Sequence, residues 1–123
     1  MIKKRQLIFS ILLVFVFQNF CFAQQQMLSS TDKKAVKAYN EGLKFYDARN
    51  NDKAIEAFSE AIKRDSNFVE AHSMLGYVYA DMKLDEKAIL ELNKALEISP
   101  HFFANNFLII ARLQLEVGDY VHA

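Results

Sequence analysis

The sequence repeats itself at a period of 34 residues. When the chain is shifted by this distance, five residues fall on residues of the same size class. The pairs are Gly42 and Gly76, Phe45 and Tyr79, Ala54 and Ala88, Phe58 and Leu92, and Ala61 and Ala95. A third copy begins one residue late, with Ala111 in the place of the glycine and Ala123 in that of the first alanine. Such a period predicts a solenoid of helix pairs, which is an interaction surface more often than a catalyst.

Residues 1–23 have the pattern of a secretory signal. A basic start at residues 3–5 precedes an apolar run at residues 7–17, and Cys21 and Ala23 are small residues of the kind a signal peptidase requires. A membrane-spanning helix needs about 20 apolar residues, so a retained membrane anchor is the less favoured alternative. We therefore predict cleavage after Ala23 and export of the remaining chain.

The remainder of the chain is mildly acidic. Three of the 15 basic residues lie in residues 1–23, whereas all 15 acidic residues follow that segment. The basic stripe that nucleic acid requires is therefore missing. The single cysteine, Cys21, also lies in the N-terminal segment, so the fold must be held by packing and not by disulfides. Residues 24–31 are a polar lead-in without periodicity, which we interpret as a flexible tether before a domain at residues 32–123.

Capping residues mark where the first two helices are expected to begin. Either Thr31 or Asp32 can cap the first helix, and either Asn51 or Asp52 can cap the second. Apolar residues recur at helical spacing after each of these caps, with charged residues on the opposite face.

The later helices follow the same alternation of apolar periods and polar turns. The fourth helix is expected to end before Pro100, the only proline, because proline cannot continue the hydrogen-bond ladder. A fifth helix is predicted over residues 101–117. Residues 118–120 then read as a turn that leads into the first turn of a sixth helix.

The phases of the small and large residues resemble the tetratricopeptide repeat family. The repeats would be residues 35–68, residues 69–102 and a truncated third repeat at residues 104–123. The resemblance implies an all-α, right-handed solenoid of antiparallel helix pairs, with two full repeats and the first helix of a third. Ser66 stands where the family often has proline, and Gln114 where it has an aromatic residue, so the third repeat is the weakest match.

The repeated glycines predict close contacts between helices. Glycine inside a helix costs about 1 kcal/mol relative to alanine, so Gly42 and Gly76 at one phase of the repeat indicate compensation by packing. The helix axes can then approach to the lower end of the range of ~8–10 Å. A bulky replacement such as Gly76→Leu is expected to force the two helices apart.

The resemblance also implies a concave groove, lined by the first helix of each pair, that binds a peptide or a protein. The groove residues implied are Tyr39, Leu43, Tyr46, Ser73, Tyr77, Asp81, Leu108 and Arg112. Tyrosine provides a large contact area and a hydroxyl, which suits recognition of a partner. The alternative is that these tyrosines only pack between neighbouring repeats. A clamp for a terminal carboxylate, as one subclass has, is not expected, because only Asn105 among the residues at the clamp positions is suitably polar.

No catalytic residue, cofactor or metal site is expected from the sequence. His72, His101 and His122 lie in different repeats and lack the spacing of metal ligands. No serine has an obvious neighbouring base, and no phosphate-binding loop is present. The sequence therefore predicts a binding protein and not an enzyme.

The lead-in and residues 33–39 are similar to exported repeat proteins of Gram-negative, Bacteroidetes-type envelopes. That resemblance implies a periplasmic or outer-membrane-associated protein. It also supplies the alternative function, a structural spacer or dimerisation segment at the N-terminus of a larger outer-membrane or peptidoglycan-associated protein.

The fifth helix is expected to leave apolar side chains uncovered. Phe107, Ile110 and Leu115 would be exposed if no sixth helix packed on them, at a cost of roughly 1.5–3 kcal/mol for each side chain. Two hypotheses follow. Either this chain is the N-terminal piece of a longer protein, or it associates with itself through the fifth helix.

Overall fold

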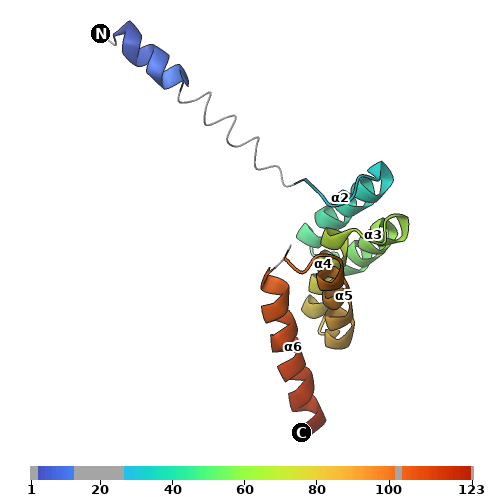
Figure 1. The fold of residues 1–123 in the computed structure, drawn as a ribbon. Coiled ribbons are helices and arrows are strands. Elements are labelled where there is room, and N and C mark those ends of the chain that lie inside the picture. Colours follow the sequence, from blue (N-terminus) through green and yellow to red (C-terminus); the bar gives the residue numbers. More distant parts are fainter. Residues whose placement is uncertain (1–2, 13–26, 102–103, 123) are drawn as a thin grey trace.

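Two antiparallel helix pairs in a row, followed by a single long helix, make up most of the described structure (Figure 1). The computed structural model describes residues 3–12, 27–101 and 104–122, and of residues 119–122 only the backbone. The described residues contain helices and no strand, and residues 4–12 are among the helical ones. The other helices are α2 (Lys33–Asp47), α3 (Asn51–Arg64), α4 (Val69–Asp81), α5 (Asp85–Ile98) and α6 (Ala104–His122). The prediction of an all-α solenoid is confirmed.

Residues outside the described ranges include most of the expected secretory signal. The cleavage position after Ala23 and the part of the lead-in before residue 27 lie there. Among the residues that are described, no helix combines the length and the apolar character needed to cross a membrane.

Side-chain caps fix the starts of the first two helices. Asp32 accepts a hydrogen bond from the backbone N–H of Ala35 at 2.7 Å and caps α2, as expected. Asn50 accepts one from the backbone N–H of Lys53 at 3.2 Å and caps α3, one residue before Asn51 and two before Asp52, the predicted caps. Asn51 is already helical, and the cap residue must be the non-helical one whose side chain reaches the free N–H groups.

The turn inside each repeat has the same backbone conformation. Arg49 and Lys83, which are one period apart, both lie in the left-handed region, with φ values of 59° and 60°. In each turn the next residue donates a backbone hydrogen bond back into the preceding helix, from Asn50 to the Phe45 carbonyl at 2.8 Å and from Leu84 to Tyr79 at 2.9 Å. This pattern satisfies carbonyl groups at the helix end and turns the chain back on itself.

The glycines lie at the crossings of the helix pairs, as their spacing predicted. A Cβ added to Gly42 would stand 2.6 Å from the ring of Phe58, and one added to Gly76 would stand 2.7 Å from Leu92 Cγ. Phe58 and Leu92 are fully buried and are themselves one period apart. Each second helix therefore places a large side chain directly on the glycine of the first helix.

The lead-in is packed onto the domain in its described part, contrary to the prediction of a flexible tether. Ser30 is buried, and Leu28 packs against the core formed by α2, α3 and α4. Ser29 makes hydrogen bonds to the start of α4. The prediction was wrong for residues 28–30 because it took lack of periodicity for lack of contacts, and polar residues can be fixed by hydrogen bonds.

Helix α6 is continuous through Gly118, where a turn was predicted. It extends from Ala104 to His122. A single glycine costs only about 1 kcal/mol in a helix. Among the described residues no later helix packs near Gly118 to favour a turn, and nothing lies within 4 Å of the position a Cβ would take there. The local preference for helix therefore prevails.

Candidate functional site

The first helices of the successive pairs, α2, α4 and α6, form what we call the first-helix face, and polar side chains connect them. At the ends of α2 and α4, the Tyr46 hydroxyl donates a hydrogen bond to the Asp81 carboxylate at 2.8 Å. Both residues were predicted to belong to the groove, and the structure brings them together. Tyr46 is half-buried and Asp81 is exposed, so the pair lies at the surface.

Asn106 connects α4 to α6 from a fully buried position. Its Nδ2 donates to Ser73 Oγ at 3.0 Å, and its Oδ1 accepts from the Tyr77 hydroxyl at 2.5 Å. A buried amide is costly unless its polar atoms are paired, so this arrangement fixes the position of α6 on α4.

Sequence reasoning missed Asn106 and considered only Asn105, at a clamp position, in this part of the chain. Asn105 is exposed, because a shift of one residue rotates a helix position by about 100°. A signal was available in the helical spacing of Asn106, Ile110 and Leu113, which are all buried. This face packs against α4 and α5, and it buries Ile110, which was expected to be exposed.

The predicted groove residues divide into buried and accessible ones. Tyr39 is only 8% exposed and packs on the rings of Phe58 and Phe68, at centroid distances of 5.7 and 4.9 Å. Ser73 is buried beside Asn106. These two side chains therefore offer little surface to a partner in this conformation.

The remaining groove candidates are partly or fully accessible. Leu43 and Tyr77 are half-buried, and Leu108 is 73% exposed. Arg112 is exposed on α6, where its Nε lies 3.8 Å from Glu116. Glu116 also lies 4.0 Å from Lys83 Nζ just beyond α4, so a weak charge network joins the two helices at the surface.

The tyrosine hydroxyls of this face are held in the protonated form. Burial, aided by the negative charge of Glu70, raises the pKa of Tyr39 to about 12. Burial also raises the pKa of Tyr77, and burial together with the hydrogen bond to Asp81 raises the pKa of Tyr46. The hydroxyls of Tyr46 and Tyr77 act as neutral donors, to Asp81 and to Asn106.

One end of the first-helix face is occupied by the lead-in. The Glu70 carboxylate accepts hydrogen bonds from the Ser29 backbone N–H at 2.9 Å and from the Ser29 hydroxyl. The Ser29 hydroxyl oxygen in turn accepts from the Val69 backbone N–H at 3.1 Å. Helix α4 has no side-chain cap on its own Phe68, so Ser29 satisfies one of its free N–H groups from a distant part of the chain.

The histidine of the second repeat has a structural role. His72 is buried, with Nε2 donating to the Ser66 carbonyl at 2.9 Å and Nδ1 lying 2.7 Å from the Glu91 carboxylate. It thereby connects the turn between the repeats to α5. Among the side chains that the structure describes, no three histidine, cysteine or acidic residues are grouped as metal ligands would be.

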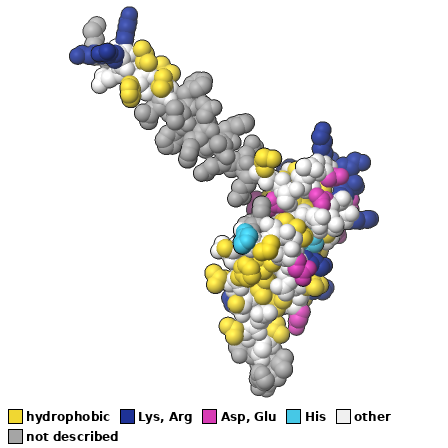
Figure 2. Space-filling model, viewed as in Figure 1, with side chains coloured by type: hydrophobic (Ala, Val, Ile, Leu, Met, Phe, Trp, Pro, Cys, Tyr) yellow, Lys and Arg dark blue, Asp and Glu magenta, His cyan; other side chains and the backbone are white. Residues whose placement is uncertain are grey.

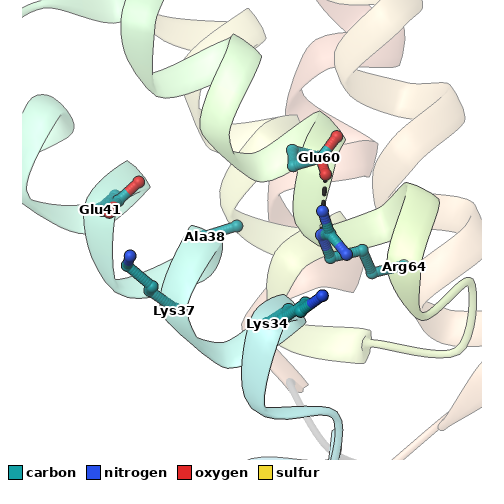
Figure 3. Close-up of a pocket in the computed structure, with 6 residues that line it drawn as sticks. All are labelled: Lys34, Lys37, Ala38, Glu41, Glu60 and Arg64. Atoms are coloured by element: carbon teal, nitrogen blue, oxygen red, sulfur yellow. Dashed lines mark ion pairs between the residues drawn. The ribbon is translucent and has the colours of Figure 1, made fainter.

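A pocket of about 310 Å³ opens between α2 and α3, at the edge of the first repeat (Figure 3). It is lined by Lys34, Lys37, Ala38, Glu41, Glu60 and Arg64. Arg64 pairs with Glu60 at 2.7 Å within α3. Charges of both signs line the pocket, so it forms a polar outer edge of the solenoid and does not indicate one class of ligand.

Helix pairs with glycine-lined crossings and a connected row of first helices define a helical-repeat interaction module. Residues 39–101 match the family model of the tetratricopeptide repeat, which is more than half of the chain. The chain therefore belongs to the tetratricopeptide repeat family.

Two solved structures of yeast Sti1 are similar to this chain. The TPR2B-domain:pHsp70-complex superimposes with a TM-score of 0.65 at 28% identity, and the match covers 72% of this chain and 70% of that one. The TPR2AB-domain:pHSP90-complex gives a TM-score of 0.67 at 27% identity, and the match covers 75% of this chain and 35% of that one.

A curated relative is much longer than this chain. The UDP-N-acetylglucosamine--peptide N-acetylglucosaminyltransferase of Giardia intestinalis is 25% identical over 100 residues. That match covers 68% of this chain but only 7% of the enzyme.

Proposed function

We propose that this chain is a non-catalytic scaffold that binds an extended peptide, or a segment of a protein, along the first-helix face. The observation that carries the proposal is the connected row of α2, α4 and α6, with the Tyr46–Asp81 and Tyr77–Asn106 hydrogen bonds holding it rigid. A face fixed in advance loses less entropy when a flexible ligand binds. The similar Sti1 structures are complexes with pHsp70 and pHSP90, which supports a peptide ligand for this fold.

Two aspartates at the ends of the first helices favour a partner with basic residues at that part of the face. Asp47 and Asp81 are one period apart and are both exposed at the ends of the first helices. The Ser29–Glu70 contact adds an example of how the face holds an extended segment, with one carboxylate accepting from a backbone N–H and a hydroxyl. We therefore expect the ligand to carry lysine or arginine near the two aspartates, with polar residues towards Glu70.

A peptide-display selection against the native protein tests this function. Wild-type protein is expected to enrich peptides that contain lysine or arginine, and the double substitution Asp47→Asn with Asp81→Asn is expected to abolish that enrichment. Glu56→Gln with Glu86→Gln, on the exposed sides of α3 and α5, serves as the matched control. If both double variants select the same peptides as the wild type, the ligand does not lie on this face.

A structural spacer is the second candidate function, and the tyrosines favour it. Tyr39 is buried, and the hydroxyls of Tyr46 and Tyr77 already have partners inside the domain. A face whose polar groups are satisfied internally has less need of a ligand. In this case the repeats separate or join other domains, at the N-terminus of a larger outer-membrane or peptidoglycan-associated protein. Failure of the peptide selection, with an intact fold, would favour this function.

We further propose that the chain is exported to the periplasm, where it is free or associated with the outer membrane. The exposed apolar side chains of residues 4–12 support this, since Phe9 is 73% exposed and Leu12 is 62% exposed. Exposed apolar side chains contribute no burial energy to the folded domain, so cleavage of this segment would not destabilise the fold. Terminal sequencing of protein from fractionated cells is expected to give Gln24 as the first residue. Met1 as the first residue of a cytoplasmic protein would contradict the proposal.

A further inference from the structure

The described part of the lead-in lies on the first-helix face as an extended chain. We call residues 27–30 the bound segment, and none of them is helical. Met27 and Ser29 are exposed, whereas Leu28 between them is half-buried and packs against the core of α2, α3 and α4. Ser30 is buried. This alternation of exposed and buried side chains is that of an extended chain on a surface.

Glu70 on α4 is the residue that holds the bound segment. It is only 5% exposed, and both of its carboxylate oxygens accept hydrogen bonds from Ser29, one from the backbone N–H at 2.9 Å and one from the hydroxyl. A buried carboxylate is costly unless its oxygens are paired. When the bound segment leaves, the carboxylate therefore needs water or another chain that offers a backbone N–H and a hydroxyl.

The start of α4 also depends on the Ser29 hydroxyl. The Val69 backbone N–H donates to Ser29 Oγ at 3.1 Å, and Phe68 at the cap position makes no side-chain hydrogen bond of its own. The hydroxyl therefore donates to Glu70 and accepts from Val69 at the same time. Serine and threonine can do both, whereas alanine can do neither.

The order of residues in the bound segment indicates what kind of chain can replace it. We propose that the bound segment is an intramolecular competitor of the ligand, and that a ligand with a serine or threonine directly after a large apolar residue displaces it from Glu70. The apolar residue would take the place of Leu28, and the serine or threonine that of Ser29. The inference rests on the peptide binding proposed above, and it adds a regulation of that binding and a second feature of the ligand.

The bound segment is held weakly enough to be displaced. Three hydrogen bonds join Ser29 to α4, and each contributes little net free energy because water replaces it in the open state. Helix α2 keeps its start when the segment leaves, since Asp32 caps it. The segment can therefore leave by local opening, without unfolding of the repeat. Because it belongs to the same chain, its effective concentration is high, and a ligand must bind more tightly to replace it.

The α6 end of the first-helix face is open by comparison. Leu108 is 73% exposed there, and Phe107 and Leu115 are exposed on the same helix, as the sequence predicted. Figure 2 shows hydrophobic side chains gathered over the part of the molecule where Figure 1 places α6. At the other end Tyr39 is buried near Glu70, whose negative charge adds to burial in raising the pKa of the tyrosine. A ligand therefore reaches α6 freely, and it reaches Glu70 only by displacing the bound segment.

Binding of the chain's own lead-in as a free peptide tests the inference. The probe is a fluorescent peptide of residues 24–31, and anisotropy measures its affinity for the native protein. The wild type is expected to bind it weakly, because the bound segment fills the site. Ser29→Pro removes the backbone N–H and the hydroxyl together, so this variant is expected to bind the probe at least about 10-fold more tightly. Met27→Pro, at a position that is 90% exposed, is the matched control and should bind it as the wild type does.

Two further variants make the test independent of how well Ser29→Pro folds. Ser29→Ala removes only the hydroxyl and should give a smaller gain in the same direction. Glu70→Gln added to either variant should remove the gain, since an amide offers one acceptor oxygen in place of two. Circular dichroism verifies that each variant keeps its helical content.

Replacement of the serine in the probe tests the requirement for a hydroxyl. A probe with alanine in place of Ser29 should bind to the Ser29→Pro protein at least about 10-fold more weakly than the original probe. A lead-in with a purely structural role gives a different result. Ser29→Pro and Ser29→Ala would then lower the denaturant midpoint and bind the probe no better than the wild type. That result would overturn the inference, as would equal binding of the serine and alanine probes.

Failure of this inference can be separated from failure of the proposed function. The probe contains no lysine or arginine, so its binding does not require Asp47 or Asp81. Selection of basic peptides without binding of the probe would overturn the competitor and leave the proposed function standing. Binding of the probe without selection of basic peptides would support the competitor and overturn the expected preference for basic residues.

Discussion

Gly76 on α4 and Leu92 on α5 are in contact so close that no side chain fits between them. A Cβ on Gly76 would stand 2.7 Å from Leu92 Cγ, and also 3.3 Å from the Ala88 carbonyl oxygen. The same contact occurs one period earlier, between Gly42 and Phe58. The repeat in the sequence is therefore a repeat of one packing contact, and the helix pair is built around it.

Replacement of this glycine by alanine should destabilise the domain. Gly76→Ala gains about 1 kcal/mol of helix preference, but overpacking against Leu92 costs about 1–3 kcal/mol, so we expect a net loss in the free energy of unfolding. Gly118→Ala is the matched control, since nothing lies within 4 Å of its Cβ position. It should be neutral or stabilising by up to about 1 kcal/mol. Urea unfolding measures both variants, and equal stabilities would contradict the packing account.

Loss of the buried amide between α4 and α6 should loosen α6. Asn106→Ala leaves the Ser73 hydroxyl without a partner in a buried position, which costs about 1–3 kcal/mol. Asn105→Ala, one residue earlier and exposed, should change stability by no more than about 0.5 kcal/mol. Hydrogen exchange of the α6 amides would locate the effect. Similar exchange in the two variants would mean that Asn106 does not position the helix.

Alkaline pH should destabilise the first repeat through Tyr39. Its pKa is about 12 in the folded state and 10 in a solvated chain, so the folded state favours the protonated hydroxyl. This contribution is fully present below pH 10 and is lost as the pH rises towards 12, and it amounts to about 3 kcal/mol. Tyr39→Phe should therefore lose less stability than the wild type between pH 9 and pH 11. Tyr79→Phe is the control, and identical pH profiles for the two variants would contradict the prediction.

Acid should weaken the contact of the Glu91 carboxylate with His72 and Lys94. Burial by itself would raise the pKa of Glu91, but hydrogen bonds from His72 and Lys94 outweigh it and hold the pKa below 4.5. A carboxyl with a lowered pKa stabilises the fold above its unfolded pKa, and that stabilisation is lost as the pH falls through the folded value.

The acid prediction is tested by a charge-neutral replacement of the carboxyl. Glu91→Gln should cost stability at pH 7 and show a smaller difference from the wild type near pH 3. Glu86→Gln, exposed on the same helix, is the control for removing a charge. Denaturant midpoints at several pH values measure the effect. A deficit for Glu91→Gln that is the same at every pH would show that Glu91 contributes by packing and not by its charge.

The part of the fold that could be predicted is the part fixed by residue size or by local hydrogen bonding. Gly42 and Gly76 could be interpreted because only close helix contact compensates for glycine in a helix. The cap at Asp32 and the end of α5 before Pro100 followed from local hydrogen bonding in the same way. These constraints act between residues close in sequence, or at a fixed period, so they are visible without a structure.

Contacts between distant residues were not visible in the sequence. The Ser29 hydroxyl accepts a hydrogen bond from the Val69 N–H at the start of α4, 40 residues later in the chain, and no periodicity indicates that pairing. Asn106 was missed because the expected groove followed the positions of the family pattern and not the helical spacing of the buried residues Asn106, Ile110 and Leu113. Gly118 was read as a turn because the family pattern has one there, whereas the helix simply continues.

The most direct test of the central claim is a comparison of two cross-linking positions on the native protein. A photo-reactive residue at Leu43, half-buried on the first-helix face and one helical turn before Asp47, should cross-link to a bound basic peptide while leaving both aspartates in place. The same residue at Leu90, which is 55% exposed on α5, should not. Cross-linking at Leu43 alone is the result that this account predicts. Equal cross-linking at both positions, or at Leu90 alone, would contradict a binding site on α2, α4 and α6.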